Sequence, residues 1–265
     1  MATDTNRRRR WTKGAYRRHR PSLTHPIRTI DVNQLPLALR WPRRQRFEHF
    51  HAGENAAAVA AVQRAVEGGE APWIYLAGPA GSGKTHLLAA ACQAASEAGK
   101  RVQYLPLRAL RGPAERAIRG SGGCDLLALD DVDALAGQRE AEHALFDLYN
   151  RCRAEGATLL FAGNEPPSQL PLTLPDLRSR LGMCTLAMLR PLSEAERRDV
   201  LRTRAQARGI ELDDAVLDWL FVHHARDLGA LGELLEDIDR ASLAAKRRVT
   251  VPFVRQLLKN RDSAA

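Results

Sequence analysis

Residues 78–85 limit what this 265-residue chain can fold into more than any other segment does. They read Gly78-Pro79-Ala80-Gly81-Ser82-Gly83-Lys84-Thr85 and satisfy the pattern GxxxxGK[ST] at every fixed position. Glycines at these positions let backbone N–H groups close around phosphates, and a helix that begins here adds the positive end of its dipole. We expect Lys84 to pair with the β- and γ-phosphates and the Thr85 hydroxyl to ligate Mg²⁺. The segment therefore predicts a nucleotide site between a strand and a helix.

An acidic motif follows an apolar run further along the chain. Residues 126–129 read as a buried strand that ends in Asp130 and Asp131. Ligands bind at the carboxyl ends of strands in open parallel sheets, which is where these carboxylates are expected. Asp130 is predicted to support Mg²⁺ and Asp131 to polarise an attacking water. An ordinary acidic strand end is the alternative, and the complete phosphate loop favours the catalytic interpretation.

Strand and helix patterns alternate through the first two thirds of the chain. Apolar runs predict strands, and periodic segments predict helices at residues 56–66, 85–98 and 141–155. The strands are predicted at residues 73–77, 101–105, 126–129, 158–163 and 184–189. Such alternation is typical of an α/β domain with a mostly parallel sheet flanked by helices.

From Pro191 onward the pattern is helical only. Ser193 with Glu196 three residues later resembles a capping box, and the helical pattern after it runs to Gly209. Further helices are predicted at residues 215–223, 228–243 and 252–258. The sequence therefore predicts a small C-terminal α-helical domain after the α/β domain.

The positive charge of the chain is concentrated at its N-terminus. Residues 1–46 hold 13 Lys/Arg and 2 Asp/Glu, whereas residues 47–265 hold 27 and 29. Residues 1–30 have almost no apolar periodicity and are expected to be a basic disordered arm. Such an arm could bind DNA phosphates without sequence preference. A solvated tail or an over-extended start is an equally weighted alternative.

Composition excludes several other classes of protein. No apolar run approaches the roughly 20 residues needed to cross a bilayer, and charge occupies the place of a signal peptide, so we expect a cytoplasmic protein without a membrane partner. The four cysteines lie far apart without a CxxC or Cys/His cluster, which indicates neither a zinc site nor a disulfide framework.

Together these motifs resemble the AAA+ ATPases and, more narrowly, the family of the DnaA initiator and its shorter regulatory relatives. The resemblance covers residues 33–260 and includes Phe47-x-x-Phe50-x-x-Gly53-x-Asn55, the phosphate loop and Leu129-Asp130-Asp131. Residues 145–151, 174–180 and 239–242 also match. It implies an AAA+ nucleotide-binding domain at residues 47–190 and a helical lid domain at residues 191–265.

The resemblance also assigns roles to residues that spacing alone does not select. It places Asn55 beside the adenine of ADP or ATP, Asn164 at the first nucleotide sensor, Arg180 at the arginine finger and Arg226 at the second sensor. By spacing alone, Asn164 after the fourth strand is equally well explained as a turn residue before two prolines, and Arg178 and Arg180 as solvated charges.

The segment Gln34-Leu35-Pro36-Leu37-Ala38-Leu39 has its own implied partner. Pro36 disfavours a helix, and an extended leucine-rich peptide suits a preformed apolar pocket. By the resemblance, it is similar to the peptide that docks on the DNA polymerase III sliding clamp (beta subunit), with Gln34 as the polar anchor and Leu35, Leu37 and Leu39 beside it. Residues 31–46 are then a clamp-binding peptide and linker, for which a plain linker is the alternative.

The resemblance implies a negative regulator of replication initiation. It would dock on the DNA-loaded clamp, insert Arg180 at the ATP of the DnaA initiator and promote its hydrolysis, while its own turnover is weak and its resting state a homodimer. The alternatives are a self-sufficient AAA+ ATPase or helicase loader, and a DNA-binding module that depends on the arm. The clamp-like peptide favours the first interpretation, since an independent loader has no evident use for it.

Overall fold

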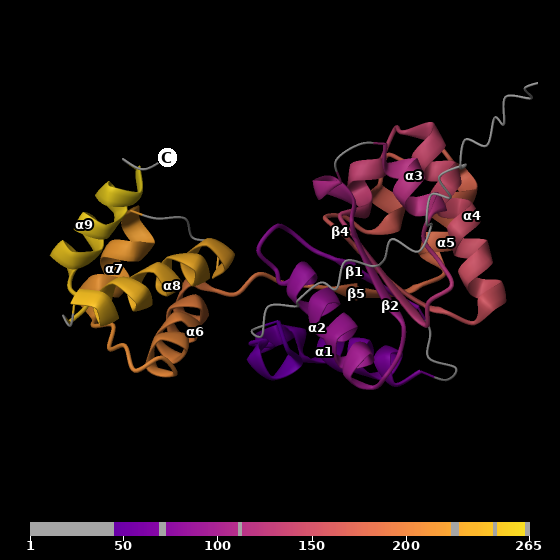
Figure 1. Ribbon diagram of the computed structural model, residues 1–265. Coiled ribbons are helices and arrows are strands. Elements are labelled where there is room, and N and C mark those ends of the chain that lie inside the picture. The colour runs from indigo at the N-terminus through magenta and orange to yellow at the C-terminus, as the bar shows by residue number, and fades with distance from the viewer. Residues whose placement is uncertain (1–44, 69–72, 111–112, 224–227, 246–247, 263–265) are drawn as a thin grey trace, which may run out of the picture. The chain divides into compact units, whose positions relative to one another are not determined.

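The computed structural model describes residues 45–68, 73–110, 113–223, 228–245 and 248–262. Its α/β part contains a five-stranded parallel sheet in the order β2-β3-β4-β1-β5 (Figure 1). The strands are β1 Ile74–Ala77, β2 Val102–Pro106, β3 Leu126–Asp130, β4 Thr158–Gly163 and β5 Thr185–Met188. The predicted fold is confirmed, and each strand lies within one residue of its predicted bounds at either end.

Helices cover both faces of this sheet. They are α1 Ala56–Glu67, α2 Lys84–Glu97, α3 Ala114–Arg119, α4 Arg139–Glu155 and α5 Pro175–Gly182. Ile74 and Leu76 of β1 pack with α1 and α2, whereas Tyr75 and Ala77 pack with α3, α4 and α5. This alternation is expected because successive side chains of a strand point to opposite faces. Figure 1 shows the two helical layers on either side of the strands.

Two helices of this part were not predicted. Helix α3 has six residues and α5 has eight, and both follow loop-like segments that contain proline. Windows this short hold about two turns, so apolar periodicity has too few repeats to be read. Helix α5 forms because Pro175 occupies its first turn, where a missing N–H costs nothing, and because Leu177 and Leu181 are buried against the core.

The C-terminal residues form the predicted helical domain. Its helices are α6 Glu194–Gln206, α7 Asp214–His223, α8 Leu228–Ala245 and α9 Val251–Asp262, and they enclose their own apolar core. The capping box is confirmed, because Ser193 N–H donates to Glu196 Oε2 at 2.8 Å and Glu196 N–H donates to Ser193 Oγ at 3.2 Å.

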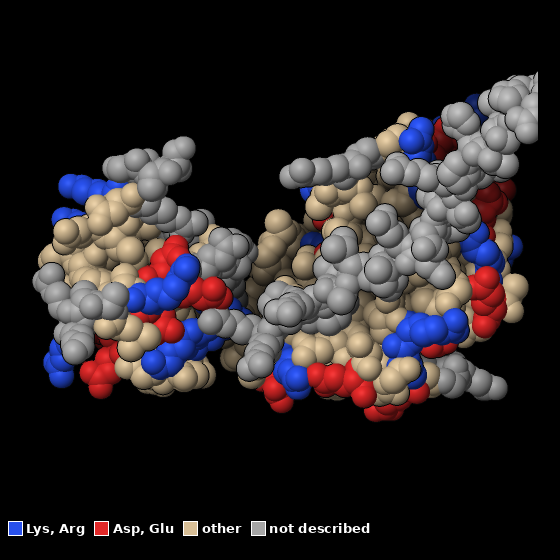
Figure 2. Space-filling view, viewed as in Figure 1, with Lys and Arg blue, Asp and Glu red and all other residues tan. Residues whose placement is uncertain are grey.

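Charged side chains of both signs are interspersed over the described surface in Figure 2, without a large patch of one sign on the face shown. This agrees with the near balance of charges after residue 46. In the described part of the chain, none of the helices combines the length and the hydropathy that a bilayer crossing needs.

Candidate functional site

The phosphate loop joins the end of β1 to the start of α2, as its sequence predicts. Gly83 adopts φ +95° and immediately precedes the helix. A Cβ at this position would meet the Phe50 ring at 2.6 Å, so glycine is required both by the backbone and by the close approach. Within the described residues, the buried Ser82 hydroxyl oxygen of this loop has no hydrogen-bond partner. An orphaned hydroxyl inside a glycine loop fits a site that binds an oxygen-rich anion.

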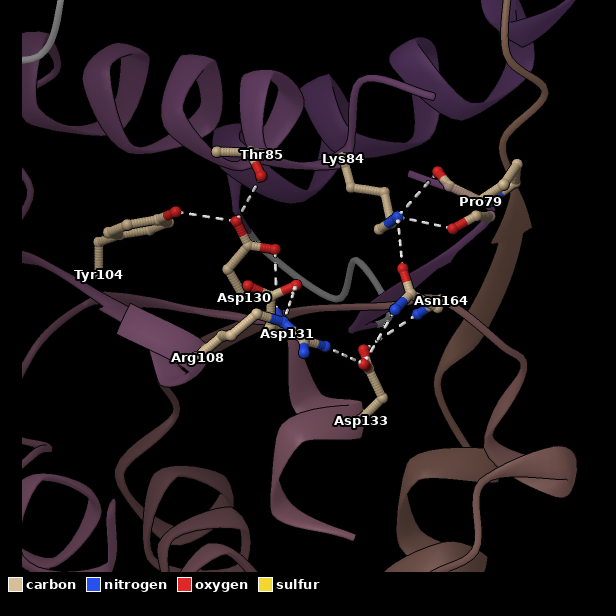
Figure 3. Close-up of polar contacts among 10 residues, drawn as sticks. Pro79, Lys84, Thr85, Tyr104, Arg108, Asp130, Asp131, Asp133 and Asn164 are labelled. Atoms are coloured by element: carbon tan, nitrogen blue, oxygen red, sulfur yellow. Dashed lines mark hydrogen bonds and ion pairs between the residues drawn. The ribbon is translucent and has the colours of Figure 1, made fainter. Parts of the chain in front are cut away.

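Lys84 is the buried cation of the loop. Its ammonium donates to the carbonyl oxygens of Gly78 at 2.6 Å and Pro79 at 3.0 Å, and to Asn164 Oδ1 at 3.3 Å (Figure 3). Burial lowers the Lys84 pKa, and the carboxylates of the acidic motif oppose that shift. The side chain is thus held at the mouth of the loop, where it can pair with a phosphate.

The acidic motif lies directly opposite the start of α2. Asp130 ends β3 and is 2% exposed, and its Oδ2 accepts hydrogen bonds from Thr85 Oγ1 at 2.7 Å and Tyr104 Oη at 2.8 Å. A hydroxyl and a carboxylate side by side are the hard oxygen donors that Mg²⁺ prefers. Thr85 and Asp130 therefore fit the magnesium site that the sequence predicts.

Asp131 has an unusual backbone conformation. Among the described residues it is the single non-glycine residue with positive φ, at φ 57° and ψ 47°. Its Oδ1 lies 3.6 Å from Arg108 Nε. Burial raises the Asp131 pKa and the neighbouring Asp130 adds to this, whereas Arg108 opposes it. Left-handed backbone at a non-glycine residue is often found at functional sites, here next to the predicted metal ligand.

Asn164 follows β4 and faces Lys84, so the structure brings this predicted residue to the phosphate loop. Asp133 orients it, since Asn164 N–H donates to Oδ1 at 3.1 Å and Asn164 Nδ2 donates to Oδ2 at 2.9 Å. Arg108 pairs with the same Asp133 carboxylate. Figure 3 shows these contacts as one connected network from Lys84 to Asp131.

Three residues of this network were not predicted, namely Tyr104, Arg108 and Asp133. Tyr104 lies on β2, and Arg108 lies in the 3₁₀ turn Leu107–Ala109 that follows it. The sequence gives no strand order; in the structure β2 is the neighbour of β3, which brings the end of β2 beside the acidic motif. Asp133 was signalled by its place two residues after Asp131.

Asn55 has a structural role that was not predicted. Its Nδ2 donates to the Arg190 carbonyl at 2.9 Å, and Arg190 N–H donates to its Oδ1 at 2.8 Å. Both ends of the amide are therefore used to tie residue 55 to the chain that leaves β5. A cavity of about 300 Å³ borders this bridge and is lined by residues 54–55, 190–193 and 196. A contact between Asn55 and adenine stays a prediction.

Arg180 lies apart from this network, in the last turn of α5. It is partly exposed, and no ion pair joins it to an acidic residue of the described chain. The predicted residues Gln34, Leu35, Leu37, Leu39 and Arg226, with the basic arm at residues 1–30, lie outside the described residues.

Comparisons with known proteins agree with this geometry. A family model described as the bacterial DnaA ATPase domain matches residues 42–187, and one described as the Hda lid domain matches residues 194–258. Domain III of DnaA from Thermotoga maritima is 23% identical, with a TM-score of 0.67 over 83% of this chain and 97% of that one. The AMPPCP-bound DnaA of Aquifex aeolicus is 24% identical, with a TM-score of 0.61 over 74% and 66%. The RuvB branch migration motor of Thermotoga maritima is 18% identical, with a TM-score of 0.59 over 83% and 73%. These likenesses confirm the AAA+ fold.

Proposed function

The chain belongs to the family of bacterial DnaA ATPase domains, and from this premise we propose that it regulates replication initiation by promoting hydrolysis of the ATP bound to DnaA. The lid model adds that its helical domain is of the Hda type, which agrees with the resemblance drawn from the motifs. In the proposed action the chain binds one nucleotide itself and presents an arginine to the nucleotide of its partner.

The phosphate-loop edge is proposed to hold ADP or ATP with Mg²⁺. Lys84 supplies the phosphate-binding cation, while Thr85 and Asp130 supply the metal-binding oxygens. A bound Mg²⁺ would neutralise phosphate charge. The adenine-nucleotide assignment is supported by a structural neighbour, the DnaA of Aquifex aeolicus, which binds AMPPCP.

The observation that carries the proposal is Arg180. It is a partly exposed arginine on a helix whose opposite face is buried, and it has no acidic partner in the described chain. An arginine supplied to the γ-phosphate of another subunit stabilises the charge of the transition state and accelerates hydrolysis by about 10³–10⁵ in other systems. One side chain at this position could therefore account for the whole regulatory effect.

Tethering to the sliding clamp is proposed for residues 34–39. Docking of this peptide would raise the local concentration of the chain near DNA-loaded clamps without a new contact to DnaA. The basic arm would add contacts to DNA phosphates, weakening steeply with salt. The resting form is proposed to be a homodimer.

The test is ATP hydrolysis by purified DnaA in the presence of the DNA-loaded clamp. We expect stimulation by the wild-type chain, and loss of stimulation in Arg180→Ala and in the Leu37→Ala/Leu39→Ala double variant. Arg178→Ala, on the same helix, is the matched control.

A self-sufficient ATPase is the second candidate, and the assembled set of Lys84, Thr85, Asp130 and Asp131 favours it. Robust hydrolysis by the chain alone, with no stimulation of DnaA, would replace the proposal with this function.

A further inference from the structure

Glu142 is a fully enclosed carboxylate that the proposed chemistry does not use. It lies in the first turn of α4 and is 0% exposed. Its Oε1 accepts hydrogen bonds from Gly137 N–H at 2.9 Å and Thr173 N–H at 3.1 Å. Its Oε2 accepts from Thr173 Oγ1 at 2.8 Å and Leu174 N–H at 2.7 Å. Each oxygen therefore accepts two bonds, and the acceptor capacity of the carboxylate is filled.

The bonds require this carboxylate to be ionised. Three of the four donors are backbone N–H groups, which can only donate, and none of the described basic side chains forms an ion pair with Glu142. Burial raises the Glu142 pKa. The hydrogen bonds from Thr173, Leu174 and Gly137 together lower it by more than burial raises it, so the net shift is downward. A glutamine of the same shape would have to point its NH₂ at one of these N–H groups.

The four donors come from two separate segments. Gly137 follows the 3₁₀ turn Val132–Leu135, which carries Asp133 of the phosphate-loop network. Thr173 and Leu174 immediately precede α5, and Leu174 is its N-cap residue. Glu142 thus ties the start of the helix that carries Arg180 to the segment that follows the acidic motif.

Apolar packing alone fixes α5 less completely. Leu177 and Leu181 hold one face of this eight-residue helix against the core. A helix held by one apolar stripe can still slide or rotate, whereas directional hydrogen bonds at its start fix where it begins. A displacement of about 1 Å in a catalytic group can cost about 10²-fold in rate.

We propose that Glu142 is a positioning residue that sets the place and direction of α5, and so delivers Arg180 to the γ-phosphate of the partner molecule. The delivery step rests on the proposed function of Arg180. The anchoring of α5 by Glu142 does not, so the two are tested by separate measurements.

The variant is Glu142→Gln, which keeps the volume and removes the charge. Glu140→Gln is the matched control, because Glu140 lies in the same turn of α4, is 76% exposed and has only a 3.9 Å ion pair with Arg119. Amide hydrogen exchange is measured on the full chain with nucleotide. We expect at least about 10-fold faster exchange in Glu142→Gln at residues 137 and 173–182, with the strands and the lid unchanged.

Stimulated hydrolysis of DnaA-bound ATP is the second readout, with Arg180→Ala as the reference for complete loss. In Glu142→Gln the maximal rate is expected to fall at least about 10-fold. The half-saturating concentration of the chain and its own affinity for ADP are expected to stay within about 2-fold, since none of the four hydrogen bonds of Glu142 involves Lys84, Thr85 or Asp130. A variant that had merely unfolded would lose ADP binding as well.

Thr173→Val and Thr173→Ser provide a second test if Glu142→Gln folds poorly. The valine removes one donor and keeps the shape, and the serine restores the hydroxyl, so stimulation should fall in the first and recover in the second. Unchanged exchange at residues 173–182 in Glu142→Gln would overturn the anchoring. Faster exchange with undiminished stimulation would overturn the delivery of Arg180. Absence of stimulation by the wild-type chain would overturn the proposed function and leave the exchange result standing.

Discussion

The phosphate-loop edge and the last turn of α5 present their charged groups in opposite ways. At the edge, Lys84 and Asp130 are each buried, and each is hydrogen-bonded to residues from more than one part of the fold. At α5, Arg180 is partly exposed and has no acidic partner in the described chain. The charged groups at the edge are paired within one molecule, whereas no acidic residue of the described chain pairs with the arginine. The difference suggests one site that is preorganised for the chain's own ligand and another that another molecule completes.

The largest expected effect separates the two regions. Arg180→Ala should lower stimulated hydrolysis of DnaA-bound ATP by about 10³–10⁵, because an arginine finger contributes that much in other systems. Its own affinity for ADP, measured by calorimetry, should not change. Arg180→Lys should recover only a small part of the rate, since lysine keeps the charge but lacks the planar fork. Weakened ADP binding in Arg180→Ala would contradict the separation.

Lys84→Ala should weaken the binding of ADP, which Arg180→Ala is expected to leave unchanged. Loss of a buried, charge-assisted contact to phosphate should weaken ADP binding by about 10²-fold, which corresponds to about 2.7 kcal/mol. Lys100→Ala serves as the control, because Lys100 bonds the carbonyls of residues 66 and 67 outside the network. Equal losses of affinity in both variants would indicate a general loss of structure.

Gly83→Ala should destabilise the phosphate-loop edge by a steric clash. Alanine would adopt φ +95° and place its Cβ 2.6 Å from Phe50, so the free energy of unfolding should fall by roughly 2–3 kcal/mol. Gly99→Ala is the matched control, with φ +79° and open space around the Cβ. Urea unfolding without nucleotide measures both, and a similar cost at the two positions would show that backbone strain alone matters.

The two regions also differ in what the sequence could predict. The phosphate loop was predicted residue by residue, because backbone geometry and phosphate binding require its glycines and lysine at fixed places. Spacing alone leaves Asn164 equally well explained as a turn residue, and only the family resemblance selects it. Its contact with Lys84 is possible because β4 ends at the same edge of the sheet as the loop. The family resemblance pointed to Arg180, but helix α5 is too short to show a periodicity.

The sequence does not reveal residues whose partners are distant in the chain, and the reason is physical. Arg108 and Asp133 are ordinary charged residues in sequence, and only the neighbouring positions of β2 and β3 bring them together. Glu142 reads as a surface residue of a helix with the pattern Arg139-Glu140-Ala141-Glu142. Its burial depends on the path of residues 173–174, which no local pattern specifies.

The smallest expected effect concerns the cost of concentrating acids at the edge. The Asp131 pKa is raised in the folded chain, chiefly by burial, so the folded state holds its proton more tightly than the unfolded state does. The ionised form therefore costs stability at neutral pH, and this cost disappears as the pH falls through the folded pKa. Asp131→Asn should stabilise the chain at pH 7, by only a few tenths of a kcal/mol because the side chain is 31% exposed and screened by solvent.

Asparagine also tolerates the left-handed backbone of residue 131. The gain should shrink toward pH 4, which thermal unfolding at several pH values would measure. Asp133→Asn is the control and should instead destabilise, since Asp133 accepts two hydrogen bonds from Asn164. A loss of stability in Asp131→Asn at pH 7 that shrinks toward acidic pH would mean that the ion pair with Arg108 outweighs repulsion among the acids. The edge would then be a stabilising cluster rather than one that gives up stability for ligand binding.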